Sequence, residues 1–336
     1  MKKILIVLIL IILFNINIKV NAVTDSSYIL LDAVSGRVLY EKNKDKRFLT
    51  ASIAKIMTTI VAIEYGDLFD RYIVDFESVN TEGSSIYLEE NDEIYLYDLL
   101  CGLMLRSGND AATLISNNVF DDYDKFIYFM NYTARRIGME NSTFENPTGL
   151  NNFTYNYSSA YDMAILMRYA LDNEIFYEIS SKKFHKAETA NNIYLWKNKH
   201  KLISGTDYVK SGKTGYTKDS GRTLVSYAEI HGLKLIAVSF NEGSDYNLHK
   251  LLFEKVEKDF TNITILEKGI YPQEIDFLNY YPEVRKDINL LIKNDSNINI
   301  KFNLLKEPFK DCGYFEIYEN NKLVYKDLLY PFYPLS

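Results

Sequence analysis

Strand-like segments stand on both sides of a long helical stretch, and this order limits the folds that the chain can adopt. Residues 28–32 and 37–41 flank Val34-Ser35-Gly36 and are predicted to form a tight hairpin. Apolar residues recur at helical spacing between 97 and 171, and strand patterns return between 208 and 241. We therefore predict an α+β domain in which early and late strands share one antiparallel sheet and the helices form a subdomain.

The last part of the chain has a different pattern. A helix predicted over 246–259 is followed by alternating polar and apolar residues over 297–304 and by a hairpin pattern over 314–325, which turns at Asn320-Asn321. No long helical pattern follows residue 262. We therefore expect two domains, a large one over 23–262 and a small all-β one over 263–336.

The first residues are typical of a cleaved signal peptide. Lys2 and Lys3 precede an apolar run over 4–14, and Val20-Asn21-Ala22 is a small-residue ending of the kind that signal peptidase cuts. The run is shorter than the roughly 20 residues needed to span a bilayer. We expect residues 1–22 to be removed and the protein to be exported, either extracellular or associated with the cell wall.

The charge of the chain argues against two classes of partner. The formal net charge is −7 for the whole sequence and becomes −10 without Lys2, Lys3 and Lys19. An acidic protein is poorly suited to nucleic acid or to anionic lipid. Two prolines within 327–336 also argue against a membrane-binding helix there, so membrane contact is expected to be weak or absent.

The cysteines, histidines and tyrosines indicate no further site. Cys101 and Cys312 are far apart and predict neither a disulfide framework nor a metal site. The four histidines have no spacing typical of a triad or a zinc site, so no metal or cofactor is expected. The 28 tyrosines fall mostly at periodic positions, which favours packing in the core over a sugar-binding platform.

Three short motifs carry the chemistry, and they occur in one order: Ser52-Ile53-Ala54-Lys55, Ser107-Gly108-Asn109 and Lys213-Thr214-Gly215. A helix predicted over 51–65 places Ser52 near its N-terminus and puts Ser52 and Lys55 on one face. A lysine can act as the base for a serine if burial or a nearby cation such as Lys213 lowers its pKa.

Backbone groups near the same serine could stabilise a reacting oxyanion. The N–H of Ser52 and that of Tyr216, which follows the third motif, are the expected donors. Each motif alone is found more often in ordinary turns, strand ends and helix surfaces than in an active site. Together, at a helix start, a helical-domain loop and a late strand, they favour nucleophilic serine catalysis.

The order and setting of these motifs resemble the low-molecular-mass penicillin-binding proteins, which are serine D-alanyl-D-alanine carboxypeptidases. Longer blocks share the resemblance: YILLDAVSGRVLYEKN, SGNDAA, RRIGMENSTFENPTGL and SGKTGYTKDSGRTLVSYA. It covers about residues 26–260. The resemblance implies a β-lactamase/transpeptidase-like catalytic domain that removes the terminal D-alanine of peptidoglycan stem peptides and reacts covalently with β-lactams.

The resemblance also implies a role for each motif residue. Ser52 would form the acyl-enzyme, Lys55 would be the base, Ser107 would relay a proton to the leaving amine, and Asn109 would orient Lys55 and the substrate amide. In the third motif, Lys213 would polarise the site, Thr214 would bind the substrate carboxylate, Gly215 would allow close approach of the peptide, and Tyr216 would supply the oxyanion N–H.

Some positions depart from the family pattern and leave alternatives open. Ala54 stands where threonine is usual, Thr148 stands where histidine is frequent, and 241–249 lacks an arginine that often binds the carboxylate. Arg222 is expected to form a surface salt bridge instead. The alternatives are a D,D-endopeptidase, a β-lactamase that uses Glu145 for deacylation, and a non-catalytic peptidoglycan-binding relative.

Overall fold

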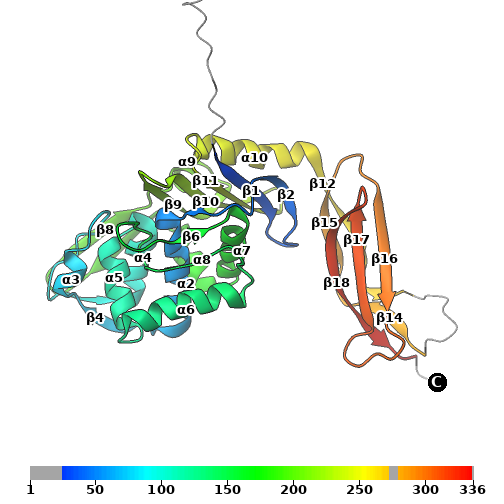
Figure 1. The fold of residues 1–336 in the computed structure, drawn as a ribbon, viewed down its shortest axis with the longest axis horizontal. Helices are drawn as coiled ribbons and strands as arrows, with labels where there is room; N and C mark the ends of the chain where they lie inside the picture. Colours follow the sequence, from blue (N-terminus) through cyan, green and yellow to red (C-terminus); the bar gives the residue numbers. More distant parts are fainter. Residues whose placement is uncertain (1–24, 272–278, 335–336) are drawn as a thin grey trace, which may run out of the picture.

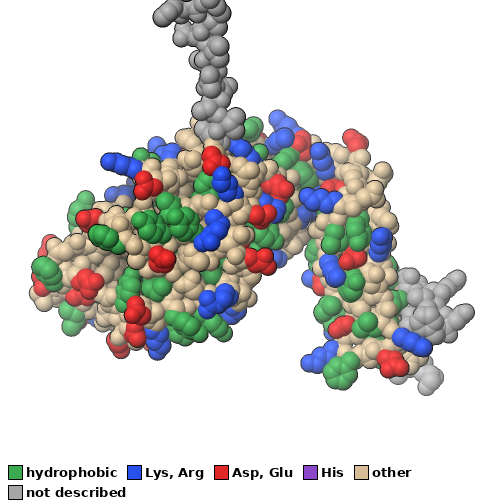
Figure 2. All heavy atoms as spheres, in the orientation of Figure 1, with side chains coloured by type: hydrophobic (Ala, Val, Ile, Leu, Met, Phe, Trp, Pro, Cys, Tyr) green, Lys and Arg blue, Asp and Glu red, His purple; other side chains and the backbone are tan. Residues whose placement is uncertain are grey.

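The structure is a computed structural model that describes residues 25–271 and 279–334. The predicted signal peptide, residues 1–22, lies outside these described residues. A part built of helices and a sheet is joined to an elongated unit of strands through α10 (Asp245–Asp259) and β12 (Phe260–Leu266), as Figure 1 shows. Positive and negative side chains are interspersed over the face seen in Figure 2.

The central sheet confirms that strands from the two ends of the predicted domain pair with each other. Its strand order is β2-β1-β11-β10-β9. β1 (Ser27–Asp32) lies antiparallel to both β2 (Val38–Lys42) and β11 (Leu233–Phe240). Gly36, with φ of +76°, forms the turn of the predicted hairpin. The α+β prediction is therefore correct.

Both faces of this sheet are covered, which explains the apolar runs in its strands. Ile29 and Leu31 of β1 belong to the core shared with the helical part, whereas Leu30 packs with Phe253 of α10 on the opposite face. β10 (Gly221–Ile230) pairs with β9 (Val209–Thr217), and Lys213 lies opposite Val225. The strand pattern predicted from residue 208 is confirmed, and β9 continues without a break through Gly212.

The helical part contains the predicted helices and a further one that follows them. The bounds are α2 (Lys55–Tyr65), α4 (Leu96–Arg106), α5 (Asn109–Asn118), α6 (Tyr123–Arg136), α7 (Ala160–Leu171) and α8 (Glu174–Ser181). Burial runs through consecutive residues of α2 (55–62) and of α4 (99–105), so these two helices lie in the interior of this part.

Several short elements connect these helices, and the sequence indicated none of them except η1, which lies at the start of the helix predicted over 51–65. They are η1 (Ala51–Ala54), α3 (Phe76–Val79), α9 (Lys201–Gly205), and the paired strands β3 (Phe48–Leu49) with β6 (Tyr157–Ser158), β4 (Arg71–Ile73) with β5 (Glu93–Tyr95), and β7 (Phe184–Glu188) with β8 (Ile193–Lys197). Elements this short carry too few residues for a periodic signal.

The C-terminal part is built of strands, and the hairpin predicted at Asn320-Asn321 joins the last two. Both asparagines have positive φ, 47° and 67°, as a tight hairpin turn requires. The strands are β13 (Gly269–Ile270), β14 (Tyr281–Val284), β15 (Ile288–Lys293), β16 (Ile298–Leu304), β17 (Gly313–Glu319) and β18 (Lys322–Phe332). They enclose a separate apolar core, and we propose that the two domains meet near β12.

Contacts between the two parts involve the first hairpin. The buried guanidinium of Arg37 donates to the carboxylate of Glu319 and lies over the ring of Phe260. Cys101 and Cys312 are both buried and free, each in its own core. Among the described residues, none of the helices has the length and apolar character needed to cross a bilayer.

Candidate active site

Ser52 lies in a single 3-10 turn, η1, directly before α2 rather than inside an α-helix. The turn begins at Ala51, whose φ is +46°, and the Thr223 hydroxyl donates to the carbonyl of Thr50 at 3.0 Å. Residues three apart are eclipsed in a 3-10 turn. The local geometry therefore places Lys55 directly behind Ser52. Ser52 is partly exposed, whereas Lys55 is completely buried.

The amine of Lys55 is surrounded by oxygen atoms from three segments. Its Nζ lies 3.4 Å from Ser52 Oγ and 2.6 Å from Asn109 Oδ1. It also donates to the main-chain carbonyl of Thr148. No carboxylate is among these partners, so the amine is oriented without a contact that would hold it as a cation.

Asn109 is itself held from both its backbone and its side chain. Its N–H donates to the carbonyl of Ser84, and its Nδ2 donates to the carbonyl of Glu82, both at 2.6 Å. Because the amide nitrogen is occupied by Glu82, Oδ1 is directed to Lys55. The loop before α5 thus presents one acceptor at a fixed place.

Ser107 ends α4 in a left-handed conformation, with φ of +68°, and faces the strand of the third motif. Lys213 Nζ donates to Ser107 Oγ and to the carbonyl of Thr214, each at 2.9 Å. Lys213 is 1% exposed and Ser107 is 4% exposed, so this contact lies in the interior.

β9 runs directly beside the serine turn. A Cβ atom added to Gly215 would lie 2.8 Å from the backbone nitrogen of Ser52, so a glycine is needed for this approach. Thr214 and Tyr216 flank that glycine in β9, and the Tyr216 side chain is 66% exposed. The structure thus gathers the segments of all three motifs around Ser52.

Burial is the main influence on the two lysines. It lowers the pKa of Lys55 to about 7, partly offset by the negative charge of Asp110. Burial also lowers the pKa of Lys213 well below its usual value, and the charge of Lys55 lowers it further. A fraction of Lys55 is therefore neutral near neutral pH, as a base requires.

Three site features were not predicted from the sequence. The carbonyl of Thr148 contacts Lys55, whereas the Thr148 hydroxyl donates to Asn146 Oδ1 at 2.9 Å. Lys199 donates to Ser84 Oγ at 3.2 Å, and its charge lowers the pKa of both buried lysines. Asp110 accepts the N–H groups of Ile86 and Leu88 and so holds the segment before β5.

Other residues weighed in the sequence lie outside this group. Arg222 forms the expected salt bridge, 2.9 Å from Asp245 Oδ1. His231 lies in a turn, whereas His200 and His249 are buried and share Ser226 Oγ as a partner, a pairing that the sequence did not indicate. Within 25–271 and 279–334, His, Cys, Asp and Glu form no cluster of metal-binding size.

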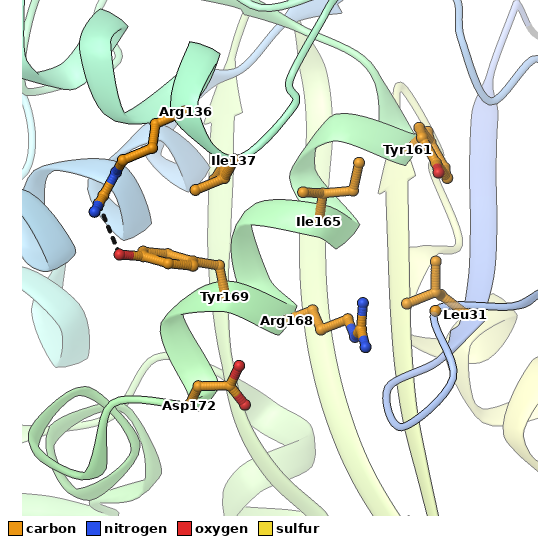
Figure 3. A pocket seen from close by; sticks show the side chains of 9 residues that line it. Leu31, Arg136, Ile137, Tyr161, Ile165, Arg168, Tyr169 and Asp172 are labelled. Atoms are coloured by element: carbon orange, nitrogen blue, oxygen red, sulfur yellow. Dashed lines mark hydrogen bonds between the residues drawn. The ribbon is translucent and has the colours of Figure 1, made fainter. Parts of the chain in front are cut away.

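A cavity of about 460 Å³ lies away from the motif residues, between the first hairpin and helices α6 and α7. In Figure 3, Arg136 donates to the hydroxyl of Tyr169, at 2.7 Å, while Arg168 points toward the first hairpin. Arg168 donates to the carbonyls of Ala33 and Val34. These arginines therefore brace α6, α7 and the hairpin against one another.

Fold and site together define a class, the serine peptidases of the penicillin-binding type. The sequence pattern described as D-alanyl-D-alanine carboxypeptidase, peptidase family S11, matches residues 15–244, and the chain belongs to this family. It is 32% identical over 220 residues to the D-alanyl-D-alanine carboxypeptidase DacF of Bacillus subtilis, covering 64% of this chain and 56% of that protein. It is 31% identical over 246 residues to DacC of Escherichia coli, covering 70% and 60%.

Solved structures share the architecture over about nine tenths of this chain. The chain resembles penicillin-binding protein 5 of Haemophilus influenzae with a TM-score of 0.77 and 22% identity, over 91% of this chain and 96% of that one. It resembles penicillin-binding protein 6B of Escherichia coli with a TM-score of 0.71 and 25% identity, over 90% and 94%. These likenesses confirm the predicted fold, including a C-terminal all-β region.

Proposed function

We propose that the protein is a serine D-Ala-D-Ala carboxypeptidase that removes the terminal D-alanine from peptidoglycan stem pentapeptides. The observation that carries the proposal is the buried amine of Lys55, which lies 3.4 Å from Ser52 Oγ and contacts only neutral groups. We also propose that it acts outside the cytoplasmic membrane, where this polymer lies. The names of its relatives and the predicted signal peptide support both parts.

Acylation begins with a proton transfer from Ser52 Oγ to neutral Lys55 Nζ. The serine oxygen bonds to the carbonyl carbon of the D-Ala-D-Ala peptide, and the electron pair of the C=O bond moves onto its oxygen. The N–H groups of Ser52 and Tyr216 stabilise this oxyanion. The 3.4 Å distance between Ser52 Oγ and Lys55 Nζ is long for a hydrogen bond, as is common before substrate is bound.

Collapse of the intermediate breaks the peptide bond. Ser107 relays to the leaving amine the proton that Lys55 took from Ser52, which returns Lys55 to its neutral form, and Asn109 binds the amide on the acyl side. Thr214 binds the terminal carboxylate, whose charge favours the ammonium form of nearby Lys213. Lys213 is already in contact with Ser107 Oγ, at 2.9 Å, so carboxylate binding and proton delivery are linked. Water then hydrolyses the ester and releases the shortened stem peptide.

The position of Glu145 gives no support to a β-lactamase. Its carboxylate accepts the N–H of Tyr155 at 2.7 Å, and the residue is exposed. A deacylating carboxylate must activate water beside the acyl-serine. Glu145 instead braces the loop that contains Asn156.

Fluorescent penicillin labelling and D-alanine release from a pentapeptide test the proposal. We expect labelling and release by the full chain, loss of both in Ser52→Ala, and no change in Ser204→Ala, which removes an exposed hydroxyl from α9. Labelling without release would overturn the carboxypeptidase assignment. Labelling that persists in Ser52→Ala would overturn the assignment of the nucleophile.

A further inference from the structure

A cavity of about 510 Å³ lies behind the segment that supports the catalytic lysine. Its size is within the range of about 300–1,000 Å³ that is usual for small-molecule sites. Residues from α3, from α5, from the start of α6 and from the Asn146–Thr148 segment line it. Phe76 and Tyr123 are 68% and 37% exposed, so two aromatic rings stand at its surface.

The polar groups of this cavity are mostly uncharged. The Thr81 hydroxyl donates to Thr113 Oγ at 3.0 Å, and Asn80 Nδ2 donates to the carbonyl of Phe76 at 2.8 Å. In the described part of the chain, no hydrogen bond occupies the hydroxyl of Tyr123. Glu77 supplies one carboxylate, and no lysine or arginine is among the described lining residues.

This combination has a definite ligand preference. Aromatic faces pack against the C–H faces of a sugar ring, while amide, hydroxyl and carboxylate groups bind its hydroxyls. A carboxylate without a cation disfavours phosphates and other anions, and the row of polar groups disfavours a purely apolar ligand. Pro147 offers a small apolar wall of the kind that an acetyl methyl group would contact.

We propose that this cavity binds a saccharide, namely an N-acetylated amino sugar of the glycan strand that bears the stem peptide. The identity of the strand rests on the proposed function, whereas the preference for a sugar rests on the cavity itself. Although the sequence favours core packing for the tyrosines, Tyr123 has its ring at the mouth of this cavity.

The cavity adjoins the catalytic groups through two segments. Thr148 lines it, and the carbonyl of the same residue contacts Lys55. Thr81 also lines it, and the next residue, Glu82, holds Asn109 through its carbonyl. A stem of five extended residues spans at most about 18 Å. On this proposal, a sugar in the cavity and the end of its stem peptide at Ser52 belong to one substrate, because the segments that line the cavity also hold Lys55 and Asn109.

Calorimetric titration with a β-1,4-linked N-acetylglucosamine tetramer tests the site. We expect the full chain to bind the tetramer, and Phe76→Ala and Tyr123→Ala each to weaken binding at least tenfold. Phe69→Ala is the matched control, because Phe69 is 83% exposed and does not line the cavity. Circular dichroism and penicillin labelling of each variant check that the fold is retained.

Turnover supplies a second measurement. Phe76→Ala should release D-alanine more slowly from a pentapeptide attached to its disaccharide, and at the wild-type rate from the free pentapeptide. Failure of the tetramer to bind, or equal binding by Phe76→Ala and Phe69→Ala, would overturn the saccharide site even if D-alanine release is normal. Tetramer binding that depends on Phe76 in a chain that neither labels nor releases D-alanine would sustain the site and overturn the proposed function instead.

Discussion

Lys55 and Asn109 are joined by a 2.6 Å contact between Lys55 Nζ and Asn109 Oδ1, and both residues are at most 2% exposed. A neutral amide in this place fixes the direction of the amine without adding a negative charge. Since burial already lowers the pKa of Lys55 to about 7, the absence of a carboxylate partner preserves the neutral form. The neutrality of the Asn109 side chain is therefore as important to Lys55 as the hydrogen bond that it accepts.

Replacing the amide by a carboxylate should inhibit acylation near neutral pH. We predict that Asn109→Asp raises the pKa of Lys55 by about 1–3 units, the usual effect of an opposite charge in contact. Penicillin labelling at pH 7 should then slow at least about fivefold and recover above pH 9. Asn118→Asp, at the other end of α5, is the control. Slow labelling at every pH would instead reflect loss of the hydrogen bond from Nδ2 to the Glu82 carbonyl.

The pH dependence of acylation in the unmodified chain follows from the same pKa. Lys55 is a base only when neutral, so the rate of penicillin labelling should increase as the pH rises through about 7 and then level off. The observed value belongs to the Lys55 and Lys213 pair, because their charges interact. Labelling rates measured from about pH 5.5 to about pH 10.5, the ordinary pKa of lysine, test this. A rate that increases only near the ordinary pKa of lysine would exclude a neutral Lys55 as the base at pH 7.

A glycine beside the serine turn should be essential for both fold and acylation. Gly149 has φ of +78°, and a Cβ atom there would lie 1.9 Å from the carbonyl oxygen of Ala51. Gly138 has a similar φ of +87° but nothing within 4 Å of the added atom. Gly138→Ala should cost about 1–2 kcal/mol of unfolding free energy from backbone strain alone.

Gly149→Ala should cost clearly more than this control and should also slow penicillin labelling. The clash would displace Ala51, which precedes Ser52, and Thr148, whose carbonyl contacts Lys55. Urea unfolding and labelling of the two variants make the comparison. Equal losses of stability, with labelling unchanged in both, would contradict the role assigned to this contact.

Side-chain type and spacing predicted one pair of motif residues that the structure brings together, and the resemblance supplied the rest. Ser52 and Lys55 are local partners, so a helical period places them correctly even though the turn is 3-10. Ser107 and Lys213 are distant in sequence, and only the resemblance joined them. The predicted sheet was correct because its strands are long enough to show a pattern.

The remaining site features could not be predicted because they depend on the main chain or on distant packing. The contact of Thr148 with Lys55 uses its carbonyl, a group that every residue has. The histidine frequent at that position is thus not needed for this contact. Lys199 reaches Ser84 from the loop between β8 and α9, and no spacing in the sequence relates the two. His200 and His249 meet only through Ser226 in the folded sheet.

The ion pair between the two parts of the chain should contribute to stability without affecting catalysis. Arg37 is 6% exposed, its partner Glu319 also accepts the N–H of Lys293 at 2.8 Å, and Arg37 precedes β2, at the sheet edge opposite β9. Arg37→Met leaves a largely buried carboxylate unpaired, which should cost about 3–5 kcal/mol. The double variant Arg37→Met/Glu319→Gln should recover part of this loss, since no buried charge remains.

Thermal unfolding of the full chain measures both effects, and the penicillin labelling rate should stay at the wild-type value. A double variant no more stable than Arg37→Met would mean that packing, rather than the unpaired charge, dominates this junction.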